Sequence, residues 1–282
     1  MQYKCLSIAG FDGSGGAGIQ ADLKTFSAFG CYGMTVLTAL PVQNTCGVKS
    51  CYHIPLQVIE EQLSTIFDDI MPDAIKIGML YSSDIIEMVA NFLEKNVAID
   101  VPIVLDPVMI AKSGDLLLQQ NAVDALRTKL VPMSTIITPN LPEAHVLVGY
   151  HDNRAMLGDK LLQLGSKAVL LKGGHHGGNT SDDLFLEQTG SPVWLTAERI
   201  ESNNTHGTGC TLSAAICALI AQKIPLREAC KYAKQYLLHA ICASKNLSVG
   251  KGRGPVNHFY HLWPTLEKVL NHTILDETKI FS

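Results

Sequence analysis

Residues 6–29, LSIAGFDGSGGAGIQADLKTFSAF, contain a short apolar run, a glycine-rich loop and a helical pattern in direct succession. The run Leu6–Ala9 is typical of a strand that is buried on both faces. From Ala17 to Phe29, apolar residues recur with the spacing found on the buried side of an amphipathic helix. A strand, a glycine loop and a helix in this order indicate the first unit of a parallel α/β sheet.

The same alternation continues along the chain. Further buried strands are predicted at Thr35–Val42, Ala74–Ile77, Ile103–Leu105, Thr135–Thr138 and Ala168–Leu171, and further helices at Leu56–Asp69, Asp84–Glu94, Asn121–Leu130 and Leu226–Ser244. Asp183–Glu187 and Val193–Ala197 flank a turn-rich stretch, which predicts an antiparallel pair at one edge. We therefore expect a single α/β domain over residues 1–282, with a mostly parallel sheet between two helical layers and a terminal helix and tail from about residue 264.

Composition narrows the classes of function. Hydrophobic residues make up 47% of the 282 residues and charged residues 17%, as in a well-buried globular protein. A net charge of −4 with scattered Lys and Arg leaves no basic stripe for nucleic acid or a membrane surface, so a small molecule is the expected partner. The 8 cysteines include no Cys-x-x-Cys pair, which argues against a disulfide framework or a zinc site. Without a leader-like N-terminus or an apolar run of about 18 residues, we expect a cytoplasmic protein.

A second glycine-rich run, Asn203-Asn-Thr-His-Gly-Thr-Gly-Cys210, leads directly into the apolar stretch 211–221. Gly207 and Gly209 allow backbone N–H groups to converge, and the helix that follows adds its positive N-terminal end, so an anion should bind here. Cys210 falls in the first turn of this helix, a position that favours the thiolate and suits a reactive group. An ordinary helix start with a buried cysteine explains the same letters equally well.

The first glycine loop resembles a dinucleotide fingerprint only weakly. Gly13, Gly15 and Gly18 satisfy the pattern G-x-G-x-x-G, but no acidic residue ends the second predicted strand, and no Lys-Ser or Lys-Thr follows the glycines. The sequence therefore predicts neither a Rossmann nucleotide site nor a Walker A loop. Either a backbone-lined ligand loop at the carboxyl end of a strand or a tight strand-to-helix turn remains.

Polar residues follow three other predicted strands. Asp106, Asn140 and Glu143 supply oxygen atoms that could hold Mg²⁺ directly or through its waters, although Asn-x-x-Glu also describes a helix N-cap. Lys172 ends a further strand, where it either reaches a phosphoryl group or lies in solvent. The loop Ala111–Asp115 is either a lid or a plain connection.

Several motifs together resemble one known family. They are Ile8–Thr25, Gln43-Asn-Thr, Lys76-Ile-Gly-Met79, Ala111-Lys-Ser-Gly114, Thr138-Pro-Asn-Leu-Pro-Glu143, Lys172-Gly-Gly-His175 and Asn204–Ser213, followed by Val249–Val256. In this order they resemble the hydroxymethylpyrimidine/phosphomethylpyrimidine kinases of thiamine biosynthesis, in the ribokinase-like superfamily. The resemblance implies a three-layer α/β/α fold, often dimeric. It also implies phosphorylation, with ATP and Mg²⁺, of 4-amino-5-hydroxymethyl-2-methylpyrimidine and then of its monophosphate.

The resemblance also implies roles for individual residues. Gly207, Thr208 and Gly209 would form the anion hole for the transferring phosphoryl group, and Cys210 would stand where many ribokinase-like enzymes use aspartate as base. The Mg²⁺ ion and the ATP phosphates would be organised by Asp106, Asn140, Glu143, Lys172 and Thr208, with Asp106 and Glu143 on the metal side. The pyrimidine pocket would be lined by Gly10, Asp22, Gln43, Met79 and Val108.

Two of these pocket residues also suit the ring on chemical grounds. The Gln43 amide can answer a ring nitrogen and its neighbouring amino group at once, and Pro41 predicts a bulge or strand end that helps to aim it. Met79 offers an adaptable apolar wall. The plainer interpretations are a strand-end polar residue and a core methionine.

Three other functions are considered. A pyridoxal or pyridoxine kinase of the same superfamily would bind a ring of similar size with a hydroxymethyl arm. A Rossmann-type oxidoreductase would rest on Gly13, Gly15 and Gly18. A non-catalytic pyrimidine sensor would bind the ring without releasing ADP, but the full set of candidate metal, lysine and cysteine groups argues against it. Phe11 and Gly13 depart from the family pattern, in which a small polar residue and a proline or serine are more usual.

Overall fold

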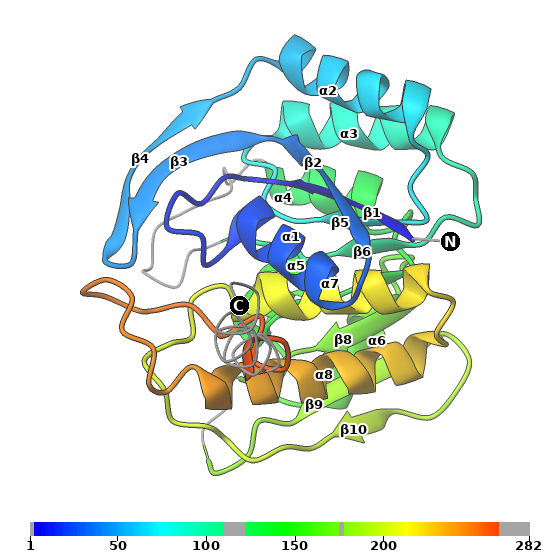
Figure 1. Ribbon diagram of the computed structural model, residues 1–282. Coiled ribbons are helices and arrows are strands. Elements are labelled where there is room, and N and C mark those ends of the chain that lie inside the picture. The colour runs from blue at the N-terminus through cyan, green and yellow to red at the C-terminus, as the bar shows by residue number, and fades with distance from the viewer. Residues whose placement is uncertain (1–2, 110–121, 175–177, 265–282) are drawn as a thin grey trace, which may run out of the picture.

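The computed structural model describes residues 3–109, 122–174 and 178–264 and contains an eight-stranded sheet with the order β10-β9-β8-β7-β6-β5-β1-β2 (Figure 1). Its strands are β1 (Lys4–Ala9), β2 (Tyr32–Leu37), β5 (Ala74–Ile77), β6 (Ile103–Leu105), β7 (Ile136–Ile137), β8 (Ala168–Leu171), β9 (Asp183–Glu187) and β10 (Val193–Leu195). From β2 to β8 neighbouring strands are parallel, whereas β8, β9 and β10 pair antiparallel, so the predicted antiparallel edge is confirmed.

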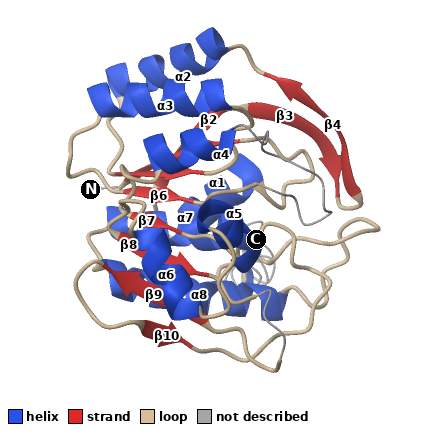
Figure 2. Ribbon diagram, turned by 180° about the vertical axis from the view of Figure 1, so that it is seen from behind, coloured by secondary structure: helices blue, strands red, loops and turns tan. Residues whose placement is uncertain are grey.

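Helices cover both faces of the sheet. One layer contains α1 (Gly18–Ala28), α7 (Thr208–Ala221) and α8 (Leu226–Ala243). The other contains α2 (Leu56–Asp69), α3 (Ser83–Asn96), α4 (Ala122–Ala125) with the π-helical turn η1 (Leu126–Leu130), α5 (Leu141–Val148) and α6 (Arg154–Leu162). Figure 1 shows the first layer from the front, and Figure 2 shows the second from behind. The three-layer prediction is confirmed.

Successive strand residues point into two separate cores. Cys5 of β1 joins the core under α7, whereas Leu6 joins the core under α2 and α3. On the α7 side the strands carry small residues such as Cys5, Ala74 and Ala168, which let α7 lie close to the sheet. Because α1 and α8 also pack against α7, every residue from Thr211 to Ala221 is buried. The apolar run that follows the second glycine loop is therefore a central helix without a polar face.

The predicted strand Thr35–Val42 is wrong as a single element. The chain leaves the sheet after Leu37, and β3 (Ala39–Asn44) pairs instead with β4 (Gly47–His53) in a separate hairpin, which Figure 2 shows extending from the sheet. Thr38 lies at the break, where its hydroxyl donates to the Met79 carbonyl at 2.6 Å and its backbone N–H donates to the Ala9 carbonyl at 3.1 Å. Pro41 itself pairs regularly with Cys51, and the irregularity that it predicts lies just beyond it, where the register shifts between Val42 and Gln43.

Other differences are local. The sequence patterns did not predict β4, α5 or α6, and the helix predicted at Asn121–Leu130 is described only from Ala122, where it forms α4 and η1. The loop Ala111–Asp115 and the terminal helix and tail, except for residue 264, lie outside the described residues. None of the described helices is long and apolar enough to cross a membrane.

Candidate active site

A cavity of about 620 Å³ opens where the parallel strands end at their carboxyl edge. Loops after β1, β5, β6, β7 and β8, the hairpin β3–β4 and the start of α7 all reach it. All but one of the predicted site residues line this cavity, namely Gly10, Gln43, Met79, Asp106, Val108, Asn140, Glu143, Lys172, Gly207, Thr208, Gly209 and Cys210. The exception is Asp22, which is fully buried.

The second glycine loop forms a tight backbone turn at the start of α7. Gly207 is the N-cap residue, with φ of 76°, and a Cβ atom there would lie 1.7 Å from the Gly16 carbonyl oxygen, so only glycine fits. A Cβ atom on Gly209 would lie 3.4 Å from both Asp106 Oδ2 and Lys172 Nζ. The turn therefore presents the N-terminal end of α7 to a lysine across the cavity, an arrangement suited to an anion.

A carboxylate and an imidazole join the two glycine loops. Asp12 accepts hydrogen bonds from the backbone N–H groups of Gly16 and Ala17, and His206 Nε2 lies 2.8 Å from its Oδ2. Although burial opposes ionisation, the bonds from His206 and Ser14 lower the pKa of Asp12 to about 2. The backbone N–H groups of Gly16 and Ala17, which would bind a pyrophosphate in a dinucleotide site, are thus already hydrogen-bonded to Asp12. The sequence did not predict this pair, because nothing local connects two residues so far apart in the chain.

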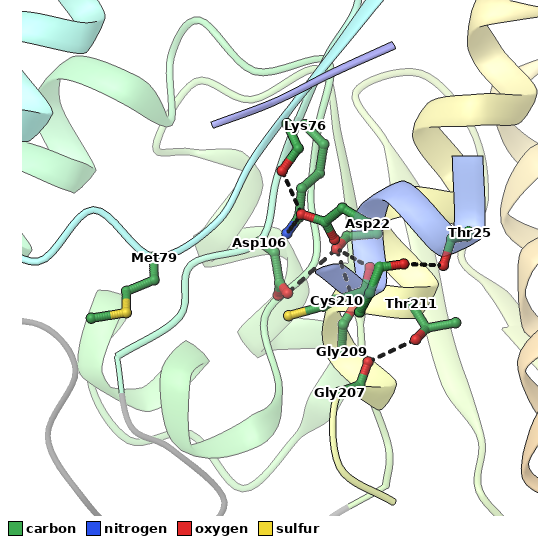
Figure 3. A network of polar contacts seen from close by, with 12 residues as sticks. Asp22, Thr25, Lys76, Met79, Asp106, Gly207, Gly209, Cys210 and Thr211 are labelled. Atoms are coloured by element: carbon green, nitrogen blue, oxygen red, sulfur yellow. Dashed lines mark hydrogen bonds and ion pairs between the residues drawn. The ribbon is translucent and has the colours of Figure 1, made fainter. Parts of the chain in front are cut away.

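Beneath the cavity lies a buried ion pair. Lys76 Nζ lies 2.8 Å from Asp22 Oδ2, both side chains are fully buried, and Ser7 donates to the same oxygen at 2.5 Å. Burial alone would lower the pKa of Lys76, but the nearby carboxylate of Asp22 raises it above its usual value. Asp22 is thus a partner of Lys76 behind the cavity wall, which differs from its predicted place in the pocket lining. Figure 3 shows the pair beside Asp106 and Cys210.

The Cys210 side chain does not favour the thiolate in the way that its helix position predicts. Burial raises the pKa of its thiol to about 11, and the carboxylates of Asp22 and Asp106 act in the same direction. Lys76 and a hydrogen bond with the Gly18 backbone act in the opposite direction. Burial and the two negative charges therefore outweigh Lys76 and the bond with Gly18, and they hold the pKa of the thiol above its usual value.

The polar groups at the ends of β6, β7 and β8 meet in one cluster. Lys172 Nζ lies 3.0 Å from Asp106 Oδ1 and 3.9 Å from Glu143 Oε2, so the lysine is not a solvent-facing strand end. Asn140 and Glu143 form a capping box at the start of α5, in which each side chain accepts the other's backbone N–H. The N-cap interpretation of Asn-x-x-Glu is therefore correct, and both residues also line the cavity.

The same cluster is chemically suited to Mg²⁺. Burial raises the pKa of Glu143 to about 7, with Asp106 adding to the effect and Lys172 opposing it, so the two carboxylates are not fully compensated by one lysine. No three acidic, histidine or cysteine side chains among the described residues are grouped to enclose a metal ion. Carboxylate oxygens that contact an ion retaining several waters fit this arrangement.

The hairpin side of the cavity is shaped by Gln43 and Met79. Gln43 Nε2 donates to the Phe11 carbonyl at 3.2 Å, which fixes the amide while its oxygen and second N–H remain for other partners. A Cβ atom on Gly10 would lie 3.0 Å from Met79 Sδ, so glycine makes room for the methionine. Met79 is both buried and part of the cavity wall, so the two interpretations of this residue coincide.

The opposite side of the cavity contains residues that the sequence motifs did not identify. Lys234 Nζ of α8 lies 2.8 Å from Asp183 Oδ2, and the other oxygen of Asp183 accepts the Gly173 N–H at 2.8 Å. Apolar side chains of α8 and of the segment after β10 form the rest of this wall, namely Ile200, Leu237, Leu238 and Ile241. The pair places a buried charge beside the loop that carries Lys172.

Comparison with known proteins gives one consistent result. Residues 12–257 match the family model of phosphomethylpyrimidine kinase. A hydroxymethylpyrimidine/phosphomethylpyrimidine kinase of Salmonella typhimurium is 48% identical over 276 residues, covering 93% of this chain and 99% of that protein. The pyridoxal kinase from Staphylococcus aureus in complex with ADP superposes with a TM-score of 0.84 at 34% identity, covering 93% and 95% of the two chains. A phosphomethylpyrimidine kinase from Clostridium difficile gives a TM-score of 0.74 at 41% identity, covering 85% and 100%.

Proposed function

Because the chain belongs to the phosphomethylpyrimidine kinase family, with a ribokinase-like fold, we propose that its cavity transfers the γ-phosphoryl group of ATP to a pyrimidine. The first acceptor is the hydroxymethyl group of 4-amino-5-hydroxymethyl-2-methylpyrimidine, and the second is the resulting monophosphate, in thiamine biosynthesis. The observation that carries this proposal is a single cavity lined by Gln43, by Lys172 and by the turn Gly207–Gly209.

The pyrimidine end of the cavity has the groups that the ring requires. The Gln43 amide pairs with the ring nitrogen and its neighbouring amino group, and Met79 and Val108 contact the ring faces. The hydroxymethyl arm then points toward Cys210 and the start of α7. Its oxygen attacks the γ-phosphorus, the bond from that phosphorus to the β-phosphate oxygen breaks, and ADP leaves. The hydroxyl proton is transferred late, because a loose transition state needs little base, and the minor thiolate form of Cys210 accepts it.

The phosphoryl group in transfer is stabilised by the start of α7 and by Lys172. The amides of Gly207, Thr208 and Gly209 face the developing charge on one side, and the Lys172 ammonium faces it on the other. The nucleotide base lies toward the apolar wall formed with α8. Asp106 and Glu143, with Asn140, would hold Mg²⁺, and the bound ion would neutralise phosphate charge.

The hairpin β3–β4 supports a homodimer. Its inward residues, Ala39 and Pro41, are buried, whereas Leu40 and Val42 alternate with them and point outward together with Tyr52. Leu40 and Tyr52 are direct cross-strand partners, so they form one exposed apolar face. We propose that a second copy covers this face and that the protein works in the cytoplasm, where ATP is supplied. Sedimentation should give a dimer for the wild type and a monomer for Tyr52→Glu.

The activity is tested by supplying Mg-ATP with each candidate acceptor separately. Release of ADP with the pyrimidine alcohol and with its monophosphate supports the proposal. Pyridoxal kinases are structural relatives, so pyridoxal is the necessary comparison, and phosphorylation of pyridoxal but not of the pyrimidine would overturn the proposal. Binding of the pyrimidine without any release of ADP would instead identify a sensor.

A further inference from the structure

The segment Gly250–Gly254, here called the strap, is fastened to two parts of the candidate active site. At the hairpin, the Arg253 N–H donates to the Thr45 carbonyl at 2.9 Å, and the Gly252 N–H donates to the Thr45 hydroxyl at 3.1 Å. At the other end, the Gly254 carbonyl accepts the His206 N–H at 3.0 Å. The strap therefore spans from the turn of the hairpin that carries Gln43 to the residue that precedes Gly207.

The glycines of the strap have a packing role. A Cβ atom on Gly252 would lie 2.0 Å from the Thr45 carbonyl oxygen, and one on Gly254 would lie 2.0 Å from Asn204 Oδ1. The backbone of the strap is thus pressed against the hairpin turn and against the second glycine loop. Figure 1 shows this orange segment beside the tip of the hairpin. These close backbone contacts fix the position of the backbone at Arg253, the residue between Gly252 and Gly254.

Arg253 lines the cavity, whereas Lys251 of the same strap does not. Three lysines line the cavity as well, and they pair with carboxylates: Lys76 with Asp22, Lys172 with Asp106 and Lys234 with Asp183. Arg199, the other lining arginine, donates to backbone carbonyls at the far side of the cavity. Arg253 lines the same cavity as Gln43 and Gly207, from a strap that joins the hairpin turn to the residue before Gly207.

The two acceptor substrates of the proposed function differ most in the charge that they carry on the hydroxymethyl arm. The pyrimidine alcohol is neutral, whereas its monophosphate carries a charge of about −1.5 to −2 at neutral pH. In the second transfer, an oxygen of that phosphate attacks the γ-phosphorus of ATP, the bond to the β-phosphate oxygen breaks, and ADP leaves. Two phosphate groups must therefore approach each other, which requires a cation on the acceptor side. A guanidinium binds phosphate through two parallel hydrogen bonds.

We infer that Arg253 binds the phosphate of the monophosphorylated substrate and so makes the second transfer possible. This inference rests on the proposed function and assigns a phosphomonoester subsite within it. A group that serves only the second acceptor should affect the two reactions unequally. A defect in folding of the strap would lower both reactions to the same extent, whereas loss of a contact to the substrate phosphate would lower mainly the second reaction.

The test compares kcat/KM for the two acceptors, each supplied separately with saturating Mg-ATP, and follows the products by phosphorus NMR. Arg253→Gln should lower kcat/KM for the monophosphate about 10- to 100-fold more than for the alcohol, as expected for loss of a charge-assisted hydrogen bond. The monophosphate should then accumulate when the alcohol is supplied. Arg253→Lys keeps the charge without the planar fork and should give an intermediate ratio.

The matched control is Lys251→Gln, which removes the other charge of the strap and should leave the ratio of the two reactions as in the wild type. An equal loss of both reactions in Arg253→Gln, or no loss of either, would overturn the inference. So would a lowered ratio in Lys251→Gln of the same size as in Arg253→Gln, since general attraction by the strap would then explain it. A wild-type protein that phosphorylates neither pyrimidine would refute the proposed function itself, whatever the variants do.

Discussion

Asp12 and His206 lie 194 positions apart in the chain, yet His206 Nε2 is 2.8 Å from the carboxylate of Asp12. The carboxylate also accepts the N–H groups of Gly16 and Ala17, and His206 directly precedes Gly207. Because a Cβ atom on Gly207 would overlap the Gly16 carbonyl oxygen, the two glycine loops meet backbone to backbone at this point. The pair therefore fixes where the start of α7 lies relative to the loop after β1.

We predict that His206→Phe lowers kcat by about 10²-fold, because a shift of the anion-binding turn by about 1 Å misplaces the phosphoryl group. Steady-state kinetics with the pyrimidine alcohol measures the effect. His206→Gln is the matched control, since its amide can still donate to Asp12 and should recover much of the rate. Equal rates for the two variants would show that the hydrogen bond to Asp12 does not position the turn.

The same pair makes a prediction about stability and pH. Since the pKa of Asp12 is lowered to about 2 in the folded state, its ionised form stabilises the fold above pH about 4, and this contribution is lost as the pH falls from about 4 toward 2. The difference in unfolding free energy between the wild type and Asp12→Asn should shrink over that interval. Urea unfolding at a series of pH values measures it. A difference that is constant down to about pH 2.5 would contradict the assignment.

Cys210 gives a prediction with a distinct pH dependence. Burial raises its thiol pKa to about 11, so the thiolate fraction grows about tenfold for each pH unit from about 7 to 10. If Cys210 is the base, kcat/KM should rise over this range, and Cys210→Ala should lose both this rise and most of the turnover while nucleotide binding survives. Calorimetry with an ATP analogue checks the binding. Unchanged turnover in Cys210→Ala would remove the residue from catalysis.

The ionisation itself can be observed without turnover. The difference in thiolate absorbance between the wild type and Cys210→Ala should titrate with a midpoint near a pH of about 11. A midpoint below about 9 would mean that the helix terminus and Lys76 outweigh burial. This second measurement separates the state of the thiol from its role in the reaction.

The buried pair Asp22–Lys76 should be important for stability. Asp22→Asn leaves the Lys76 ammonium without its carboxylate in a fully buried place, which should lower the unfolding free energy by about 3–5 kcal/mol. Urea unfolding at neutral pH measures the loss. Glu228→Gln, which breaks an exposed ion pair with Lys231, is the control and should cost about 1 kcal/mol or less. Similar losses in both variants would contradict the buried-charge argument.

The sequence could predict those features that depend on residues close together in the chain. Buried parallel strands and amphipathic helices repeat locally, so α2 was predicted with its observed bounds and the alternation of strands and helices was predicted as well. The ends of neighbouring strands in a parallel sheet meet at one edge, and for this reason the sequence alone could place Asp106, Glu143 and Lys172 in one site.

The missed features depend on contacts that no local pattern records. At the break after Leu37, Thr38 bonds to Met79, and at the connection of the glycine loops Asp12 meets His206. The helix position of Cys210, which favours the thiolate, is visible in the sequence, whereas the burial and the carboxylates of Asp22 and Asp106 that raise the pKa of its thiol are not. Local signals therefore locate the site, and distant partners determine its electrostatics.

In the proposed function Gln43 recognises the ring, so its replacement is the most direct test of the pyrimidine end. One N–H of its amide is already held by the Phe11 carbonyl, so the side chain is oriented before a ligand arrives. Gln43→Leu keeps most of the volume but removes both polar partners of the aminopyrimidine, and it should weaken binding by about 1–3 kcal/mol through unpaired polar groups. Calorimetric titration with the pyrimidine alcohol measures the change. Gln57→Leu, on the exposed side of α2, makes the same exchange away from the cavity and should bind as the wild type does. Equal affinities for Gln43→Leu and the wild type would remove Gln43 from the recognition of the ring.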